Sequence, residues 1–512
     1  MRLPRLITRF AGGITPIILV PILALTCLVS WGFSSPVGSS PDDDFHLTSI
    51  WCGDGTRADI CEPAAQSDER TVPKDLFTAE CFAFQPDTTG KCQGADFGTH
   101  PDVTVETDRG NFTGLYPPLY YATMGLFAGP NIDISVLAIR IFSSLVFVGL
   151  LTALFFLLPA ARRSSLVWPL IISTVPLGLF IVSSTNPSSW AVLSAATLWA
   201  ALLGFYETSG WRKVGLGAFA AISTVLGAGA RADAAVFAGV AIVAVIIITA
   251  RRTKNFLLSS LLPLALLIVA MLFYFSTRQS DVTTGGLDGS GGHRSLGEMA
   301  SLFIINVVNV PDLIVGAFGH WGLGWLDTAM PAVVWVVAFG VFVAVLFFAL
   351  RLSSWRRSIA SLWVLLALWL FPTIVLVQTG AVVGAYVQPR YILPLIVLLA
   401  GIVLSNHRSA SLGLSMGQLV VLAAPLAVVQ ALALHTNIRR YTAGANHPTF
   451  NLDANRLWWW DIGVTPMAVW VIGSLAFAGM LAVIVLIVGN QASRGPASND
   501  LIQDRQFQRR GK

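Results

Sequence analysis

Long hydrophobic runs separated by short polar turns make up most of this chain. About twelve of the runs are long enough to cross the hydrocarbon core of a bilayer as α-helices. The pattern therefore predicts an all-α polytopic membrane protein with about 12 transmembrane helices. The predicted spans cover roughly residues 14–33, 136–158, 166–184, 188–206, 214–230, 234–250, 256–275, 331–350, 358–377, 390–405, 412–434 and 465–489.

Polar residues collect in a few longer segments, which divide the chain into regions. The largest polar segment follows the first predicted helix and holds fifteen acidic residues between Ser34 and Leu115. Its scattered glycines and prolines predict a compact irregular subdomain rather than a linker. The predicted regions are 1–33 (tail and first helix), 34–130 (loop with an interfacial helix), 131–275 (helices 2 to 7), 276–330 (loop with interfacial helices), 331–489 (helices 8 to 12, with a loop at 435–464) and 490–512 (tail).

The distribution of charge predicts the orientation of the chain. Only 12% of the 512 residues are charged, about half of what soluble domains carry. With the N-terminus in the cytoplasm, the inner segments hold 19 Lys and Arg against three acidic residues, and the outer segments hold 12 against 24. This follows the positive-inside rule and predicts that both termini lie in the cytoplasm. The basic residues lie in short clusters between apolar runs, so we expect no nucleic-acid partner.

Four of the five cysteines lie in the first polar segment, which the orientation places outside the cytoplasm. Cys27 is alone inside the first predicted helix. The spacing contains no C-x-x-C pair, so two disulfides are favoured over a zinc site. Three connectivities are open for the four residues involved, Cys52, Cys61, Cys81 and Cys92.

An acidic cluster, Pro41-Asp42-Asp43-Asp44-Phe45-His46, begins a few residues after the first predicted helix. Adjacent carboxylates repel each other, and a divalent cation (Mg, Mn or Ca) bound by Asp42, Asp43 and Asp44 would relieve that repulsion. One aspartate could instead act as a general base toward a sugar hydroxyl. The alternative without function is a solvated acidic turn that caps a helix at residues 45–51.

Arginines stand near the ends of several predicted spans. Arg390 and Tyr391 lie at the outer end of one span, where a guanidinium and a phenol could bind a lipid phosphate. Arg231 lies in a very short turn and could bind phosphate too, or pair with Asp233. Arg140, in the second span, allows the same phosphate interpretation, or plain snorkelling toward the headgroups.

Other polar and aromatic residues on the outer side could contact a substrate. Asn186 begins an Asn-Pro turn, which by itself predicts only a helix start. The run Trp458-Trp459-Trp460 is typical of a membrane-interface anchor, or it could stack on a sugar ring. The cytoplasmic loops are too short to bind a nucleotide, so any chemistry belongs on the outer face.

Four motifs together resemble one family. They are Pro41-Asp42-Asp43-x-x-His46, Tyr116-Pro117-Pro118-Leu119-Tyr120-Tyr121, Asn186-Pro187 and Pro389-Arg390-Tyr391-Ile392-Leu393-Pro394. The chain resembles the bacterial polytopic proteins catalogued as domain of unknown function 2142, which look like members of the GT-C superfamily of membrane glycosyltransferases.

The resemblance implies a GT-C-like fold and transfer of a sugar from a polyprenyl-phosphate donor to a cell-envelope glycan or lipid acceptor on the outer face. It maps the acidic motif onto Asp42 and Asp43, although the family's usual second residue is Glu. Arg390, Tyr391, Arg231 and Arg140 would bind the donor phosphate. The residues expected to bind substrate are His46, Tyr116, Tyr120, Asn186 and Trp459. The resemblance also implies a location in a bacterial inner membrane. The alternative is a transporter or flippase of lipid-linked envelope precursors, since twelve spans are typical of secondary transporters. The oligomeric state is not predicted.

Overall fold

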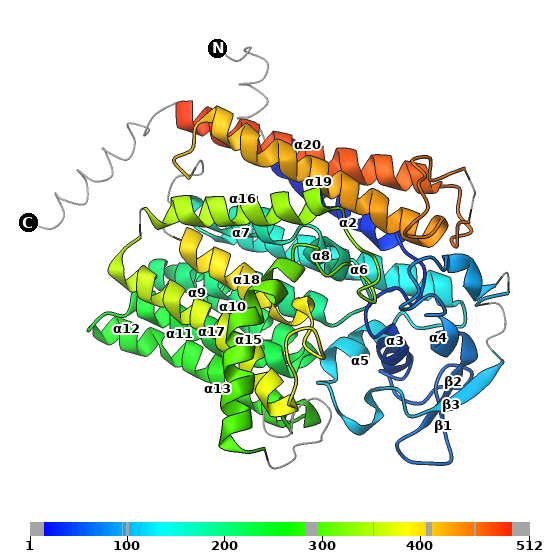
Figure 1. Cartoon of the computed structure of the whole chain (residues 1–512). Coiled ribbons are helices and arrows are strands. Elements are labelled where there is room, and N and C mark those ends of the chain that lie inside the picture. Colours follow the sequence, from blue (N-terminus) through cyan, green and yellow to red (C-terminus); the bar gives the residue numbers. More distant parts are fainter. Residues whose placement is uncertain are drawn as a thin grey trace, which may run out of the picture.

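Long helices form a bundle that carries a smaller polar domain at one end (Figure 1). The computed structural model describes residues 15–94, 96–98, 102–281, 294–351, 353–405, 412–454 and 457–493. The basic N-terminal tail and most of the C-terminal tail, on which the predicted orientation partly depends, lie outside the described residues. We call the polar domain between α2 and α6 the cap, and the end of the bundle that carries it the cap end.

Among the described residues, ten helices are long and apolar enough to cross a membrane. They are α6 (Ile132–Leu157), α9 (Ser188–Glu207), α10 (Gly210–Ala230), α11 (Ala232–Thr249), α12 with α13 (Lys254–Ser259 and Leu261–Phe275), α15 (Leu296–Gly316), α16 (Ala332–Leu350), α17 (Trp355–Thr379), α19 (Met416–Thr442) and α20 (Pro466–Ser493). Two shorter apolar helices are α2 (Thr15–Phe33) and α18 (Pro389–Leu404). The all-α polytopic membrane fold is therefore confirmed.

One predicted span is interrupted. The apolar run 166–184 forms α7 (Arg163–Ser173) and α8 (Leu177–Val182), with Pro176 between them. Proline has no backbone N–H and disfavours helical geometry in the residue before it, so α7 ends and a new helix begins. A short helix, η3 (Ala160–Arg162), precedes α7. The prediction of one continuous helix here was wrong.

Helix α15 occupies part of the region predicted to lie on the membrane surface. Its first turn is preceded by Arg294, which donates to the carbonyl of Gln378 at the end of α17. Asn306, midway along α15, donates to the carbonyl of Ala381. The last residue, Gly316, lies against Pro389 at the start of α18. Helix α15 therefore contacts the end of α17 and the start of α18, both at the cap end of the bundle. Its location on the membrane surface stays a prediction.

The cap contains a small antiparallel sheet, which the prediction of an irregular subdomain did not include. Its strands pair in the order β1-β2-β3, with Val72 opposite Val105. The elements of the cap are α3 (Asp43–Trp51), β1 (Glu62–Pro63), β2 (Arg70–Pro73), α4 (Lys74–Thr78), η1 (Gly90–Gln93), β3 (Thr104–Thr107), η2 (Asn111–Thr113) and α5 (Leu119–Gly125). A further short helix, η4 (Arg278–Asp281), follows α13.

Two disulfides close loops in the cap, as predicted. Cys52 pairs with Cys61, and Cys81 pairs with Cys92. Each bond joins residues close in the sequence, so each loop is constrained locally, which limits the conformations of the unfolded chain.

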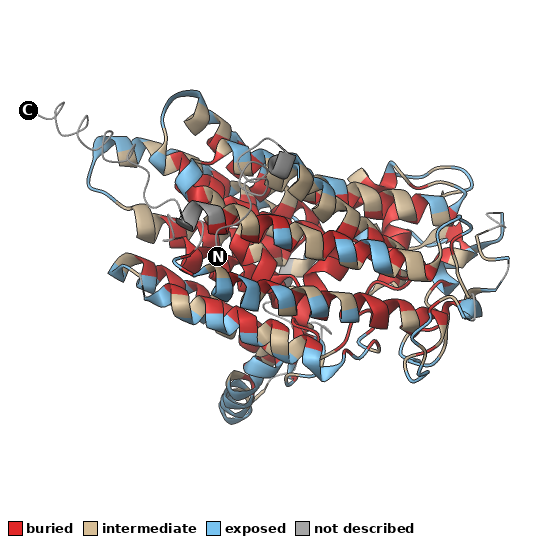
Figure 2. Cartoon of the chain, turned by 90° about the horizontal axis from the view of Figure 1, so that it is seen from above, coloured by how far each residue is buried: buried red, intermediate tan, exposed pale blue. Residues whose placement is uncertain are grey.

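The hydrophobic core lies in the middle of the bundle, around α9. Every residue in the apolar window of α9 is buried, whereas the outer helices are buried on one side only (Figure 2). The cap has a second core, to which the buried residues Tyr120 and Tyr121 belong. This second core includes residues of the bundle, so the cap packs directly against the bundle.

Candidate functional site

Asp42 lies at the junction of the bundle and the cap, between α2 and α3. It is the N-cap residue of α3 and has left-handed backbone angles, φ 59° and ψ 29°. This conformation costs a residue other than glycine roughly 1 kcal/mol or more. Such a residue persists only where its surroundings hold it, so the segment leading to Asp42 has to be firmly fixed.

Side chains from distant elements fix the segment between α2 and Asp42 by donating to its backbone carbonyls. Buried Arg140 alone reaches three of them, at 2.7 to 2.8 Å. Each remaining donor satisfies a group that burial would otherwise leave unpaired. The donors and the carbonyls they reach are Arg140 to Gly32, Ser35 and Pro36, Asn437 to Ser34, Gln93 to Val37, Trp325 to Gly38, and Asn186 to Pro41.

Asp43 joins the cap to the turn between α8 and α9. Its carboxylate accepts hydrogen bonds from the Thr185 hydroxyl at 2.5 Å and from the Ser40 backbone N–H at 2.9 Å. The residue is completely buried, and burial raises the pKa of its carboxyl to about 6 despite these hydrogen bonds. Asp43 was predicted as a catalytic carboxylate; in this arrangement it holds Asp42 in place.

Asp42 forms an ion pair with Arg390, as the predicted site requires. Arg390 Nη2 lies 2.5 Å from Asp42 Oδ2 and 3.0 Å from the Tyr391 hydroxyl, and Nη1 contacts Gln388. The Arg390 side chain is 2% exposed and that of Asp42 is 29% exposed. Burial acts to raise the pKa of Asp42, but the charge of Arg390, with Arg109 and Arg231 beyond it, holds this pKa below its usual value.

Arg231 adds a second buried guanidinium beside this pair. It forms a two-pronged ion pair with Asp233, as the structural alternative predicted, at 2.7 to 3.2 Å. It also lies over the ring of Tyr391, 4.9 Å from the centroid, and near that of Tyr116 at 5.6 Å. Its Nη1 is buried and has no hydrogen-bond partner in the described part of the chain. One donor thus remains for a ligand.

Asp44 pairs with Arg109, which the sequence did not single out. Arg109 Nε lies 2.5 Å from Asp44 Oδ2, and its guanidinium packs over the ring of Phe45. Arg109 follows β3, 65 residues after Asp44. No local motif marks it, because the contact depends on how the cap folds.

The three aspartates do not converge. Each has its own protein partner, and no group of three His, Cys, Asp or Glu side chains that could hold a metal occurs in the described ranges. A divalent ion shared by Asp42, Asp43 and Asp44 would have to displace Arg390 and Arg109 from two of them. The metal site stays a prediction, and it would need a rearrangement of these ion pairs.

His46 packs among aromatic side chains one helical turn after Asp42. The ring Nδ1 of His46 lies 2.8 Å from the Tyr121 hydroxyl, and Tyr116 packs against the same ring. Burial lowers the pKa of His46 to about 3, so the imidazole is neutral near pH 7. Its Nε2 has no partner among the described residues. His46 and Tyr120, both predicted to contact substrate, are fully buried; Tyr116 is partly exposed.

Three other predicted residues make structural contacts and do not touch the Asp42 side chain. The amide of Asn186 is used by the carbonyl of Pro41 and the N–H of Ser188. Arg140 is 1% exposed and lies beneath the segment it holds, so it faces no substrate in this arrangement. Trp459 packs against Gly90 of the cap and the ring of Tyr441. The tryptophan run therefore lies between cap and bundle, with Trp458 and Trp459 partly exposed, and stacking on a sugar ring stays a prediction.

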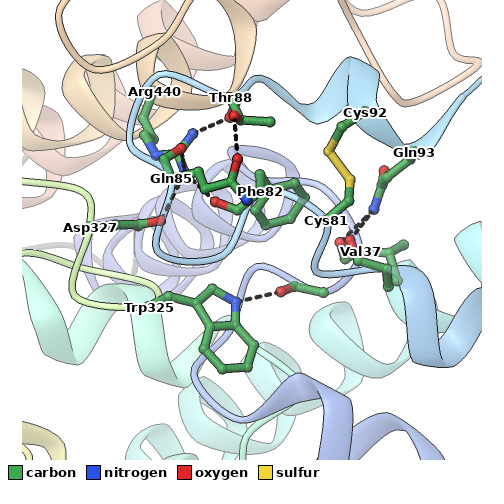
Figure 3. The surroundings of a disulfide bond; sticks show 12 residues. Val37, Cys81, Phe82, Gln85, Thr88, Cys92, Gln93, Trp325, Asp327 and Arg440 are labelled. Atoms are coloured by element: carbon green, nitrogen blue, oxygen red, sulfur yellow. Dashed lines mark hydrogen bonds and ion pairs between the residues drawn. A yellow bond between two sulfur atoms is a disulfide. The ribbon is translucent and has the colours of Figure 1, made fainter.

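Arg440, near the end of α19, joins the bundle to the cap (Figure 3). Its guanidinium donates to the carbonyls of Phe82, Gln85 and Thr88, inside the loop closed by the Cys81–Cys92 disulfide. It also pairs with buried Asp327 at 2.8 Å. Nearby, the Trp325 indole donates to Gly38, so this network reaches the segment that carries Asp42.

Comparison with known proteins confirms the family that the motifs resemble, domain of unknown function 2142. A family model described as "Predicted membrane protein (DUF2142)" matches residues 25–399. The match extends from α2 into α18 and includes Asp42, Arg231 and Arg390. Comparisons with curated proteins and with solved structures gave no match.

Proposed function

The chain belongs to the DUF2142 family of predicted membrane proteins, and from its site we propose that it is a GT-C-like membrane glycosyltransferase. The donor is a polyprenyl-phosphate sugar, and the acceptor is a hydroxyl of a cell-envelope glycan or lipid. The observation that carries the proposal is the contact of Asp42, partly exposed, with Arg390, almost fully buried, at the end of an apolar bundle.

The buried donors beside Asp42 support an anionic ligand. Arg390 Nε and Arg231 Nη1 are both buried without a hydrogen-bond partner among the described residues. Buried polar groups are nearly always paired, and those that are not call for an explanation. A phosphate supplies several strong acceptor oxygens, which two guanidinium groups with the Tyr391 hydroxyl could bind.

In the proposed reaction the acceptor hydroxyl attacks the anomeric carbon of the donor sugar. The bond between that carbon and the phosphate oxygen breaks, and its electron pair leaves with the polyprenyl phosphate. Asp42 takes the proton of the attacking hydroxyl as general base. Arg390 and Arg231 stabilise the negative charge that develops on the departing phosphate.

The cap end of the bundle, which carries the site, would face the outside of a bacterial inner membrane. Two disulfides in the cap support this orientation, since disulfides form and persist outside the reducing cytoplasm. The polyprenyl chain of the donor would then lie in the outer leaflet, next to Arg390. Both chain termini would lie in the cytoplasm.

The test is transfer by the full-length protein in liposomes that contain a radiolabelled polyprenyl-phosphate sugar and an envelope glycan extract. We expect Asp42→Asn to lose roughly a hundredfold or more in rate, the usual contribution of a general base. Asp68→Asn, at an exposed aspartate of the cap, is the matched control and should transfer normally. Equal transfer by both variants would refute the role of Asp42. Movement of intact lipid-linked sugar across the bilayer without transfer would favour the flippase alternative.

A further inference from the structure

An apolar cavity lies inside the membrane part of the bundle, away from the site. It has a volume of about 540 Å³ and lies between α2, α6, α7 with α8, and α20. Its lining is mainly hydrophobic and includes Ala24, Leu28, Leu151, Ile171 and Phe477. The cavity is partly open to the outside of the bundle, and a space of this size forgoes many van der Waals contacts unless a ligand fills it.

The cavity extends toward the end of the bundle opposite the cap. On α6, which starts beside the cap at Ile132, the lining residues begin only at Phe147 and continue to Phe156 near the end of the helix. On α7 the lining begins with Arg163, the first residue of that helix. None of Asp42, Arg231 and Arg390 takes part in it. The cavity is thus separate from the site proposed for sugar transfer.

Arg163 stands where the cavity reaches the far end of the bundle. Its Nε donates to the carbonyl of Phe155 at 3.0 Å, and its guanidinium packs over the Phe155 ring. In the described part of the chain no carboxylate pairs with it, in contrast to the neighbouring Arg162, which is paired with Glu207. Arg163 is only partly buried, so its remaining N–H groups can meet a headgroup.

We propose that this cavity binds one acyl chain of an anionic phospholipid, with the lipid phosphate on Arg163. The mainly apolar lining fits a flexible hydrocarbon chain, and the guanidinium of Arg163, which has no carboxylate partner among the described residues, complements the phosphate charge. The lipid comes from the leaflet at the far end of the bundle. The proposal does not depend on the proposed glycosyltransferase activity, since it uses none of the same residues.

The test is native mass spectrometry of the purified full-length protein after titration with phosphatidylglycerol. We expect Arg163→Gln to weaken binding roughly tenfold, the usual effect of losing a charged hydrogen bond. Arg252→Gln removes an exposed charge at the same end and should bind as the wild type does. Ala24→Phe keeps the charge but fills the cavity and should reduce occupancy, whereas Val343→Phe, on the lipid-exposed side of α16, should not.

Phosphatidylglycerol with a photoreactive group in one acyl chain gives an independent readout. After irradiation we expect adducts on peptides from α2, α6, α7 or α20, with fewer adducts in Ala24→Phe. Adducts confined to other helices, or equal binding by Arg163→Gln and Arg252→Gln, would overturn the proposal. So would a clear preference for polyprenyl phosphate over phosphatidylglycerol, since that would identify the cavity as a polyprenyl site.

Discussion

Asp42 and Arg390 are 348 residues apart in the sequence, and their side chains lie 2.5 Å apart in the folded chain. The group proposed to take the acceptor proton and the group proposed to hold the donor phosphate therefore neutralise each other when no substrate is bound. A donor phosphate that binds Arg390 competes with Asp42 for its positive charge. Under the proposed function, binding of the donor and weakening of the ion pair to the general base are therefore coupled.

Replacement of Arg390 should change both donor affinity and pH dependence. In Arg390→Gln the KM for the donor should rise roughly tenfold or more, because a charged hydrogen bond to phosphate is lost. The pKa of Asp42 should rise, since Arg390 is the main charge that lowers it against the effect of burial. As the reaction needs the ionised carboxylate, the acidic limb of the kcat/KM profile should move to higher pH. Measured pH–rate profiles check this, with Arg252→Gln as control; an unmoved acidic limb would contradict it.

Arg140 should matter for stability rather than for donor binding. Arg140→Met leaves the buried carbonyls of Gly32, Ser35 and Pro36 without their donor. We expect the free energy of unfolding to fall by on the order of 3 kcal/mol or more. Thermal unfolding of the purified protein measures the loss, and exposed Arg252→Met is the comparison. A wild-type melting temperature in Arg140→Met would show that these contacts are dispensable.

Asp43 should give the fold a measurable pH dependence. Burial raises its folded-state pKa from 3.8 to about 6. Between these two pH values the Asp43 carboxyl loses its proton in the unfolded chain but keeps it in the folded chain. The contribution of Asp43 to the free energy of unfolding therefore falls as pH rises from about 4 to about 6 and is constant above that. The stability of the wild type relative to Asp43→Asn should therefore decrease by on the order of 3 kcal/mol over this range. Denaturant unfolding at several pH values tests it; a difference that grows with pH would have the wrong sign.

The number of free thiols can be measured directly. The chain has five cysteines, of which Cys27 alone is free. A thiol-specific reagent applied to the unfolded, unreduced protein should add one label, and five after reduction, as read by mass spectrometry. Reduction should also lower thermal stability, because the Cys81–Cys92 loop supplies the carbonyls that hold Arg440. Two or more labels before reduction would show that a disulfide is absent.

The hydrophobic pattern was sufficient to predict most of the helices, because burial in lipid demands long apolar segments whatever their neighbours. It failed at Pro176, where local backbone chemistry outweighs a continuous apolar run. The same count of spans predicted that Asp42 and Arg390 share one end of the bundle. The ion pair between them follows from that placement together with their opposite charges.

The partners of the other site residues could not be predicted in the same way. Asp44 meets Arg109 and Asp43 meets Thr185 only because the cap folds back onto the bundle. Arg140 looked like a phosphate ligand because an arginine in a span is costly. Its guanidinium instead donates hydrogen bonds to backbone carbonyls of a neighbouring segment. No pattern in the sequence distinguishes these two outcomes.

The hydrogen bonds that fix the segment before Asp42 also determine how late in synthesis the site can form. Asp42 leaves the ribosome early, but three of its supports, Trp325, Arg390 and Asn437, belong to the last two-fifths of the chain. A nascent chain that stalls before Asn437 has the aspartate without its full support. The fully supported centre can therefore form only after Asn437 has been made, and under the proposed function fragments that lack Arg390 should be inert.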